Sequence, residues 1–345
     1  AISVLAGWDG IDALIVIFIR PLLTAPSDVA TAIHEAVAAL PRELPVQAVF
    51  MAADDHEALH QRAGVPTHRF PEDAARALGK VARYVRWRRR PAPGPAPLPA
   101  GIRRDEATAI LAEALAAGRE WLDPGRRQRL LECYGIATPA VRAAADPAAA
   151  GAAAEALGRA VALKAVGPEI VHKTELGAVR LGLSGAGEVE TAAREIDAEL
   201  WRRGLARESF EVQAMAGEGV ELIVGIATDP VFGPVLACGA GGTAVELLGD
   251  VGLRVCPLDA DDPAELLAGL AIRPLLDGYR GAPAADLPAL EDLIARVGAL
   301  AEAHHEIVEL DLNPVLAGPD GALAVDARVR LAPAPPPRPW PRTWD

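Results

Sequence analysis

Two basic side chains and a histidine lie close together in one short stretch of the sequence. Lys164 closes an apolar, strand-like run, and His172 and Lys173 follow in the segment that leads to a second such run. A lysine ammonium group binds phosphate oxygens, and a histidine can accept a phosphoryl group or act as a general base. A solvated strand-end lysine and a solvated loop histidine are the alternatives. The clustering, with Gly177 close by, favours a phosphate-binding role.

Three oxygen-bearing side chains near the C-terminal end form a second candidate site. Asp311 and Asn313 lie two residues apart on one predicted strand, so their side chains share a face. The turn at 318–321 places the strand that carries Asp326 beside them. Carboxylate and amide oxygens, completed by nucleotide phosphates, are suitable ligands for Mg²⁺. An exposed, polar hairpin face would explain the alternation, but not the choice of Asp and Asn at all three positions.

One carboxylate and one glycine-rich turn give weaker signals. Glu221 stands in an otherwise apolar strand, where a buried carboxylate needs a partner such as a nucleotide ribose or a structural arginine. Further along, Gly239, Gly241 and Gly242 precede Glu246, and glycines allow backbone N–H groups to approach an anion. The spacing matches neither the dinucleotide-binding nor the P-loop fingerprint.

Composition narrows the classes of protein to consider. The net charge of −13 argues against a nucleic-acid partner, and the one basic run, residues 83–91, ends a predicted helix. No apolar run of membrane-spanning length and no signal peptide is visible, so we expect no membrane association. The three cysteines form neither a disulfide framework nor a CxxC site, which favours a cytoplasmic location. His304 and His305 point apart on a helix, so a zinc site is not expected.

The elements that position the candidate residues follow a Pro-rich linker at 91–102. Helices are expected at 105–117, 124–134, 146–158, 187–204, 261–270 and 285–303. Strands are expected at 160–166, 178–183, 210–216, 220–229, 233–241, 308–318 and 321–331. Adjacent strands mixed with helices indicate α+β architecture, and we divide residues 103–331 into subdomains at 105–210 and 211–331.

Residues 1–90 show a different pattern. Strand-like runs at 13–19, 45–52 and 65–70 alternate with helical runs at 26–40, 53–64 and 71–90. This alternation predicts a parallel, doubly wound α/β sheet, and its three units suggest a partial flavodoxin-like domain. The first residues lack Met and read as the middle of a domain, so we expect a fragment of a longer protein. Residues 332–345 form a Pro-rich tail.

From residue 105 to 331 the chain resembles the ATP-grasp (beta) portion of the NDP-forming acyl-CoA synthetases. These include the ADP-forming acetate–CoA ligases and are relatives of succinyl-CoA synthetase. The resemblance lies in the order of LLECYGIATP, VALKAVGPEIVHKTELGAVRLGL, VELIVGIATDPVFGPVLACGAGGTAVELLGDV, LLDGYRG and ELDLNPVLA with GALAVDARV. Residues 1–90 resemble the end of the CoA-ligase domain that precedes ATP-grasp in single-chain members.

The resemblance implies roles for the phosphate and metal residues, with ATP or ADP and Mg²⁺ as cofactors. Lys164 would hold the α- and β-phosphates, and His172 would lie near the γ-phosphate, where a phosphohistidine relay has been suggested. Asp311, Asn313 and Asp326 would bind Mg²⁺.

The resemblance also implies how the nucleoside would be held. Gln213, Ala214 and Met215 would form the adenine hinge through backbone groups, and Glu221 would bind the ribose hydroxyls. Family members often carry Glu in place of Ala214, so one contact is in doubt. The phosphate end would be lined by Lys173, Gly241, Gly242, Glu246 and Arg254.

The implied reaction is acyl-CoA + ADP + Pi ⇌ carboxylic acid + CoA + ATP, with phosphoryl transfer between a histidine and ADP. CoA-binding and swinging-histidine domains are not recognisable in this chain, so we expect them as partners in cis or in trans. CoA and a small carboxylic acid would bind there, and the intact enzyme would be an oligomer. The alternatives are a non-catalytic ATP- or acyl-CoA-sensing module of a protein acetyltransferase fusion, and an ATP-grasp ligase of another substrate class.

Overall fold

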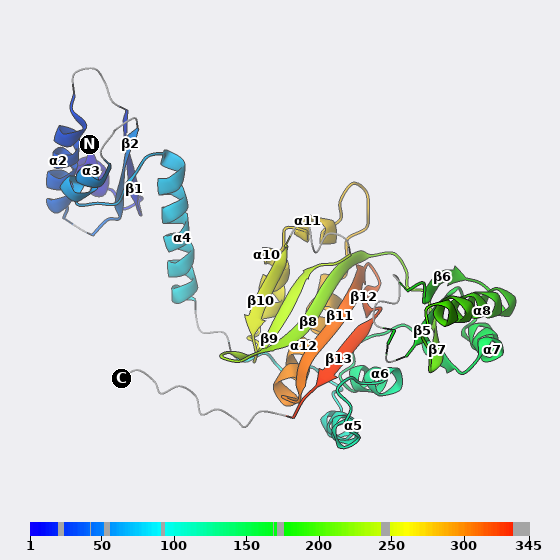
Figure 1. Cartoon of the computed structure of the whole chain (residues 1–345). Helices are drawn as coiled ribbons and strands as arrows, with labels where there is room; N and C mark the ends of the chain where they lie inside the picture. Colours follow the sequence, from blue (N-terminus) through cyan, green and yellow to red (C-terminus); the bar gives the residue numbers. More distant parts are fainter. Residues whose placement is uncertain are drawn as a thin grey trace. The chain divides into compact units, whose positions relative to one another are not determined.

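The computed structural model describes residues 1–19, 24–41, 43–51, 56–90, 94–167, 169–170, 176–242 and 249–333, with only the backbone of His56 and Ala63. The chain divides into two compact units, Ala1–Ala92 and Pro93–Asp345 (Figure 1). In the described ranges, no helix has the length and apolar character needed to cross a membrane.

The first unit is a small parallel α/β layer. Its strands are β1 (Leu14–Ile19), β2 (Val46–Met51) and β3 (Thr67–His68), in the order β1-β2-β3. Its helices are α1 (Ile2–Ala6), α2 (Pro26–Ala38), α3 (His56–Ala63) and α4 (Pro71–Arg89). Ala30 and Ile33 of α2 pack against Ala48 and Phe50 of β2. The predicted parallel sheet is confirmed.

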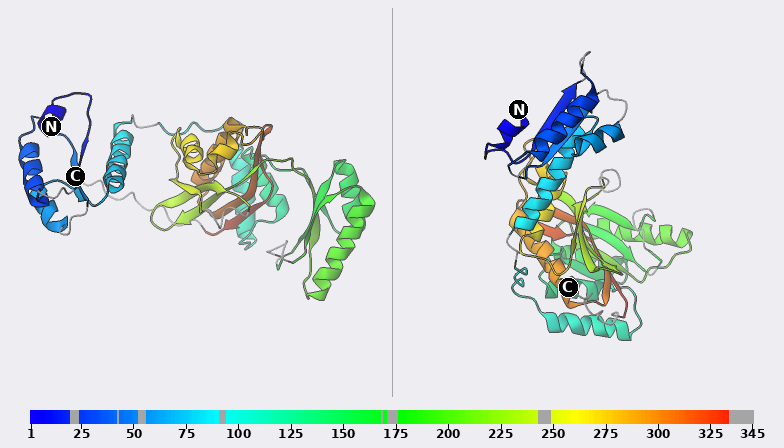
Figure 2. Two further views of the ribbon diagram at one scale, coloured as in Figure 1. Left: turned by 90° about the horizontal axis from the view of Figure 1, so that it is seen from above. Right: turned by 90° about the vertical axis from the view of Figure 1, so that its left-hand side faces the viewer.

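The second unit contains two antiparallel sheets, and the smaller one defines the first subdomain. It consists of β4 (Val141–Ala144), β5 (Val161–Val166), β6 (Val179–Leu183) and β7 (Ser209–Ala214), in the order β4-β7-β5-β6. The helices α7 (Pro147–Leu157) and α8 (Ala186–Arg202) lie side by side on one face (Figures 1 and 2). The side chain of Asp146 caps α7 by accepting from the N–H of Ala149, and Gly158 ends the helix in the left-handed region.

The larger sheet defines the second subdomain. Its strands are β8 (Val220–Asp229), β9 (Gly233–Ala240), β10 (Val251–Val255), β11 (Ile307–Gly318), β12 (Gly321–Ala324) and β13 (Ala327–Leu331). Their order is β10-β9-β8-β11-β12, and β13 also pairs with β11. The helices are α5 (Arg104–Ala116), α6 (Pro124–Cys133), α10 (Asp262–Gly269), α11 (Arg273–Leu276) and α12 (Leu287–Ala303). Leu222, Val224 and Ile226 alternate along β8 and share a core with the apolar side of α12.

The structure differs from the sequence-based expectation in how the subdomains divide. The helices α5 and α6 were assigned to the first subdomain, but Leu111 and Leu130 are buried in the core of the second. The apolar face of a helix packs where a complementary surface is available, whatever its place in the chain. The boundary set at residue 210 also runs through β7, whose last residues belong to the smaller sheet.

Two details of the strands differ from expectation. The strand expected at 160–166 is present as β5, but Lys164 does not close it, because β5 continues to Val166. The single strand expected at 321–331 is divided into β12 and β13, with Asp326 in the link between them. The link remains tied to β11, since the N–H of Asn313 donates to the carbonyl of Asp326 at 3.1 Å.

Candidate functional site

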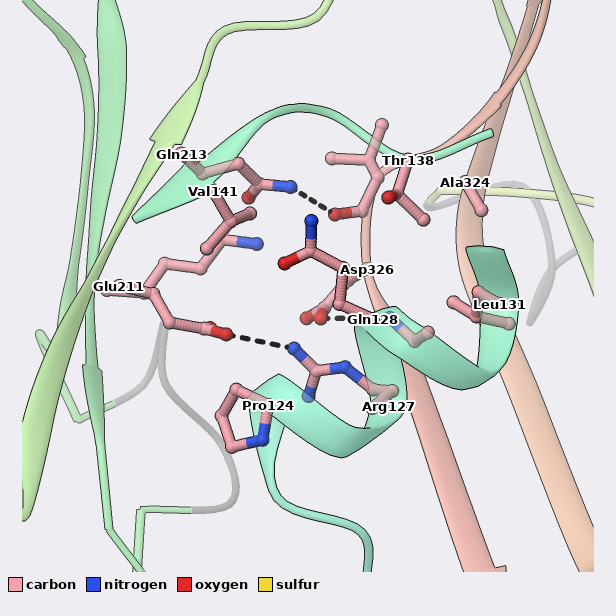
Figure 3. Close-up of a pocket in the computed structure, with 13 residues that line it drawn as sticks. Pro124, Arg127, Gln128, Leu131, Thr138, Val141, Glu211, Gln213, Ala324 and Asp326 are labelled. Atoms are coloured by element: carbon pink, nitrogen blue, oxygen red, sulfur yellow. Dashed lines mark hydrogen bonds and ion pairs between the residues drawn. The ribbon is translucent and has the colours of Figure 1, made fainter. Parts of the chain in front are cut away.

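A pocket in the second unit is lined by residues of both subdomains. Its walls come from α6, β4, β5, β7 and the link between β12 and β13 (Figure 3). The polar and charged lining residues are Arg127, Gln128, Thr138, Lys164, Glu211, Gln213 and Asp326. Lys164, Glu211 and Gln213 are only 8%, 4% and 5% exposed. Polar groups buried to this degree require partners, so this arrangement is specific rather than incidental surface polarity.

Strand β7 supplies two of these polar residues from one face. Phe210 and Val212 enter the core of the first subdomain, so Glu211 and Gln213 point the other way, into the pocket (Figure 3). The carboxylate of Glu211 accepts from Arg127 Nη2 at 3.0 Å. Gln213 Nε2 donates to the backbone carbonyl of Val325 at 2.7 Å. Both contacts cross from the smaller sheet to the second subdomain.

Lys164 lies in the middle of β5, where its backbone is flanked by two strands. Its Cα partners are Val179 of β6 and Glu211 of β7. The side chain therefore shares the pocket face with Glu211, while Leu163 and Ala165 belong to the core. A buried cation beside a pocket is suited to binding an anionic ligand such as a phosphate group.

Acidic residues of β11 and the β12–β13 link form the other part of the site. The Cα partners of Asp311 are Gly225 and Arg328. Burial raises the pKa of the Asp311 carboxyl, the positive charge of Arg328 lowers it, and the charges of Glu309 and Asp326 raise it further. Asp311 and Asp326 are thus close enough to repel each other, a repulsion that a bound cation would relieve.

The structure brings together some of the residues that were predicted to bind magnesium. Asn313 is exposed and its N–H donates to the backbone of Asp326, whose carboxylate accepts from the N–H of Ala327 at 2.9 Å. Two carboxylates and one amide fit Mg²⁺ if nucleotide phosphates and water complete the coordination. Across the described parts of the chain, no group of three or more His, Cys, Asp or Glu side chains is arranged to hold a metal.

Glu221 lies beside the glycine-rich turn. The N–H of Gly241 donates to the carbonyl of Glu221 at 2.8 Å, and Gly242 has φ +62°. A Cβ atom on Gly242 would displace the end of the Glu221 side chain, and the left-handed backbone conformation there favours glycine. Contrary to the expectation of a buried carboxylate, Glu221 is on the exposed face of β8 and needs no internal partner.

The part of the chain that contains both subdomains matches known proteins. Residues 113–331 match the family model described as the ATP-grasp domain. The chain belongs to the ATP-grasp family. It is 35% identical over 235 residues to the beta subunit of ADP-forming acetate–CoA ligase I of Pyrococcus furiosus. The matched residues are 66% of this chain and 98% of that subunit.

Two further relatives support the same assignment within the ATP-grasp family. The ADP-forming acetate–CoA ligase I of Archaeoglobus fulgidus is 34% identical over 282 residues, which are 81% of this chain and 41% of that protein. A structure of the dinucleotide-forming acetyl-CoA synthetase 1 of Ca. Korarchaeum cryptofilum, with CoA and Ca-AMPCP, superimposes with a TM-score of 0.63 at 37% identity. The match covers 66% of this chain and all of that one. The chain corresponds to the beta portion of these ligases and spans less than half of the Archaeoglobus protein.

The residues predicted to contact nucleotide fall into separate groups. Lys164, Gln213 and Asp326 line one pocket. Beside them, the N–H groups of Ala214 and Met215 donate to the carbonyls of Ala140 and Ala160, both at 2.9 Å. A hinge contact with a base would therefore have to use carbonyl groups rather than these N–H groups.

Some predicted residues are not brought to this pocket. Arg254 is on β10, where its guanidinium pairs with Asp262 at 2.6 Å and with Glu265 at 3.4 Å on α10. It does not line the pocket, and a phosphate contact would require it to leave these carboxylates. The predicted residues His172, Lys173 and Glu246 lie outside the described residues.

The sequence analysis missed Arg127 and Glu211. A signal for Glu211 was present, because it alternates with buried residues in FEVQAMA and shares its face with Gln213. Arg127 gave no signal, since it stands in a run of polar and basic residues at the start of a helix. The two residues are 84 positions apart, and only the fold brings them together.

Proposed function

We propose that this chain is the nucleotide-binding half of an ADP-forming acyl-CoA synthetase. The intact enzyme would catalyse acyl-CoA + ADP + Pi ⇌ carboxylic acid + CoA + ATP. The observation that supports this most directly is a pocket between two ATP-grasp subdomains that combines a buried lysine, Lys164, with Asp326 of a magnesium-type acidic group. The ligase relatives favour this proposal over a sensing module of an acetyltransferase.

The proposed roles follow from what phosphoryl transfer requires. Such a transfer needs alignment and cations around the phosphates rather than covalent chemistry by many side chains. Lys164 would neutralise charge on the α- and β-phosphates. Asp311, Asn313 and Asp326 would hold Mg²⁺, which when bound supplies further positive charge at the phosphates. His172 would accept the phosphoryl group or position it.

The remaining parts of the reaction are proposed to lie with partner domains. A structure of the Korarchaeum protein is described with Mg-AMPPCP and with its phosphohistidine segment pointing towards the nucleotide binding site. By analogy, a partner with a CoA site and a mobile histidine would deliver the phosphoryl group to this chain in the cytoplasm, within an oligomer. ATP and Mg²⁺ would then be the cofactors of the present site.

Calorimetric titration with ATP and Mg²⁺ tests the proposal. The wild-type chain should bind, and Lys164→Met should weaken binding by about tenfold or more, because a desolvated phosphate loses its cation. Lys80→Met is the matched control, since Lys80 is exposed on α4 in the other unit. Equal affinities of wild type and Lys164→Met, or no binding by wild type, would contradict the proposal.

A transfer experiment addresses the reaction itself. The chain is incubated with γ-³²P-labelled ATP, Mg²⁺ and a partner from an ADP-forming relative that carries the mobile histidine in its unphosphorylated form. Acid-labile label on the partner's histidine is expected, and label on His172 of this chain would show a relay. Absence of transfer in a preparation that binds ATP would favour the sensing module instead.

A further inference from the structure

We propose that Glu211 and Arg127 are positioning residues of the nucleotide site, which hold Lys164 in place through a buried row of alternating charge. The inference rests on the proposed function, because it concerns how the phosphate-binding lysine is kept in its working position.

The ion pair between Arg127 and Glu211 is buried and joins two subdomains. Its nitrogen–oxygen distance is 3.0 Å, and the side chains are 17% and 5% exposed. Arg127 is carried by α6, whose Leu130 and Leu131 are anchored in the core of the second subdomain. Glu211 is carried by β7 of the first. Loss of either partner would leave a buried charge uncompensated, which is far costlier than loss of a surface ion pair.

Glu211 also faces Lys164. The two residues are Cα partners on adjacent antiparallel strands, so their side chains share a face, with Cβ atoms about 5 Å apart. The Glu211 carboxylate therefore pairs with the cation of α6 and shares a sheet face with the cation of β5. It offsets their mutual repulsion and keeps both at the wall of the pocket. Among the described residues that line the pocket, Asp326 is the one other charged residue.

Arg127 itself lines the same pocket (Figure 3). With Glu211 neutralising one of the two cations, the row carries a net positive charge that remains available to a phosphate. An ion pair that served only to join the two subdomains would not need Lys164 beside Glu211. Gln213, two residues along, also bridges the subdomains but does so without charge and lies opposite Ala162.

Charge reversal separates positioning from simple bridging. In the full chain, Glu211→Gln should weaken ATP·Mg²⁺ binding by about tenfold in calorimetry and leave adenosine binding unchanged, because only phosphate contacts depend on Lys164. The double variant Arg127→Glu with Glu211→Arg restores attraction between α6 and β7 but places an arginine beside Lys164. Its thermal unfolding should recover towards wild type, while its ATP affinity should stay about tenfold low.

A control variant and a nucleotide-free measurement complete the test. Glu199→Gln removes a carboxylate that pairs with Arg202 and Arg203 at the C-terminal end of α8, and it should change neither the ATP affinity nor the adenosine affinity. The chain has three lysines, Lys80, Lys164 and Lys173, so the NMR signals of an ε-¹³C-lysine-labelled chain can be assigned by single Lys→Arg variants. The Lys164 signal should shift in Glu211→Gln without nucleotide, and the Lys80 signal should not.

The outcomes distinguish this inference from the proposed function. Full recovery of ATP affinity in the charge-reversed chain would show that the ion pair only joins the subdomains, and would overturn the inference. An unchanged Lys164 signal in Glu211→Gln would overturn it as well. If the wild-type chain binds no ATP while the Lys164 signal still shifts, the proposed function fails and the positioning of Lys164 by Glu211 stands.

Discussion

Asp311, which is proposed to bind Mg²⁺, is a residue at which ligand binding would be gained at the expense of stability. Burial is the largest influence that raises its pKa, so the neutral carboxyl is favoured more in the folded chain than in the unfolded chain. The stability that this group contributes is present below the ordinary pKa of aspartate and is lost as pH rises through the raised pKa. Asp311→Asn should therefore be more stable than wild type at pH 7, and the difference should vanish below about pH 4.

The same substitution should weaken Mg²⁺-dependent ATP binding. We expect Asp311→Asn to lower Mg²⁺-dependent ATP affinity by about tenfold at pH 7.5, since one carboxylate ligand is lost. Wild-type affinity should fall as the pH drops and Asp311 becomes protonated, whereas the variant should lose less over that range. Thermal unfolding and calorimetry across pH measure both effects, with Asp320→Asn at the exposed β11–β12 turn as the control. A wild-type stability advantage at pH 7 would contradict the argument.

The turn after β9 illustrates a constraint at the level of an element. Gly242 and Gly158 have nearly the same φ, +62° and +65°, but only Gly242 would bring a Cβ atom against the Glu221 carboxylate. Alanine at either position should cost about 1 kcal/mol of unfolding free energy from backbone strain. Gly242→Ala should in addition displace the carboxylate and reduce ATP affinity by about fivefold. Equal nucleotide affinities of the two variants would show that Glu221 does not bind the ribose.

The boundaries of the helices and strands show how much of the fold could be predicted from the sequence. The parallel sheet of the first unit and most strands of the second could be predicted, because alternation and turn residues are local signals. The division at Asp326 could not, since it depends on pairing with β11. The packing of α6 on the larger sheet could not either, since an apolar helix face does not specify its partner.

Contacts within the site show the same limit. Lys164 and Asp326 could be named as candidates because their residue types are unusual for their surroundings and match a family pattern. The buried state of Lys164 and its neighbour Glu211 depend on strand register, which a single strand sequence does not encode. Arg127 is the extreme case, because its partner is distant in the chain and its own surroundings in the sequence are uniformly polar.

The whole molecule should unfold in two steps. Each unit has its own core. Among the described residues, the buried apolar cluster of the first unit has seven members, whereas the two clusters of the second unit are far larger. The first unit also exposes Ile17, Ile19 and Trp87, so less of its apolar surface is removed from water. Stability rises with buried apolar area, which predicts that this unit melts at the lower temperature.

Nucleotide should move only the upper of these two transitions. Lys164, Glu211 and Asp326 all belong to the second unit, and a ligand stabilises only the cooperative unit that binds it. ATP·Mg²⁺ at 100 times its dissociation constant contributes about 2.7 kcal/mol, which should raise that melting temperature by roughly 5–10 °C. Differential scanning calorimetry with and without ATP measures both transitions. Lys164→Met provides the control, because tenfold weaker binding should shift its upper transition by about half as much at the same ATP concentration and its lower transition not at all. A single transition, or two that rise together, would mean that the units are thermodynamically coupled and that the first responds to the nucleotide site.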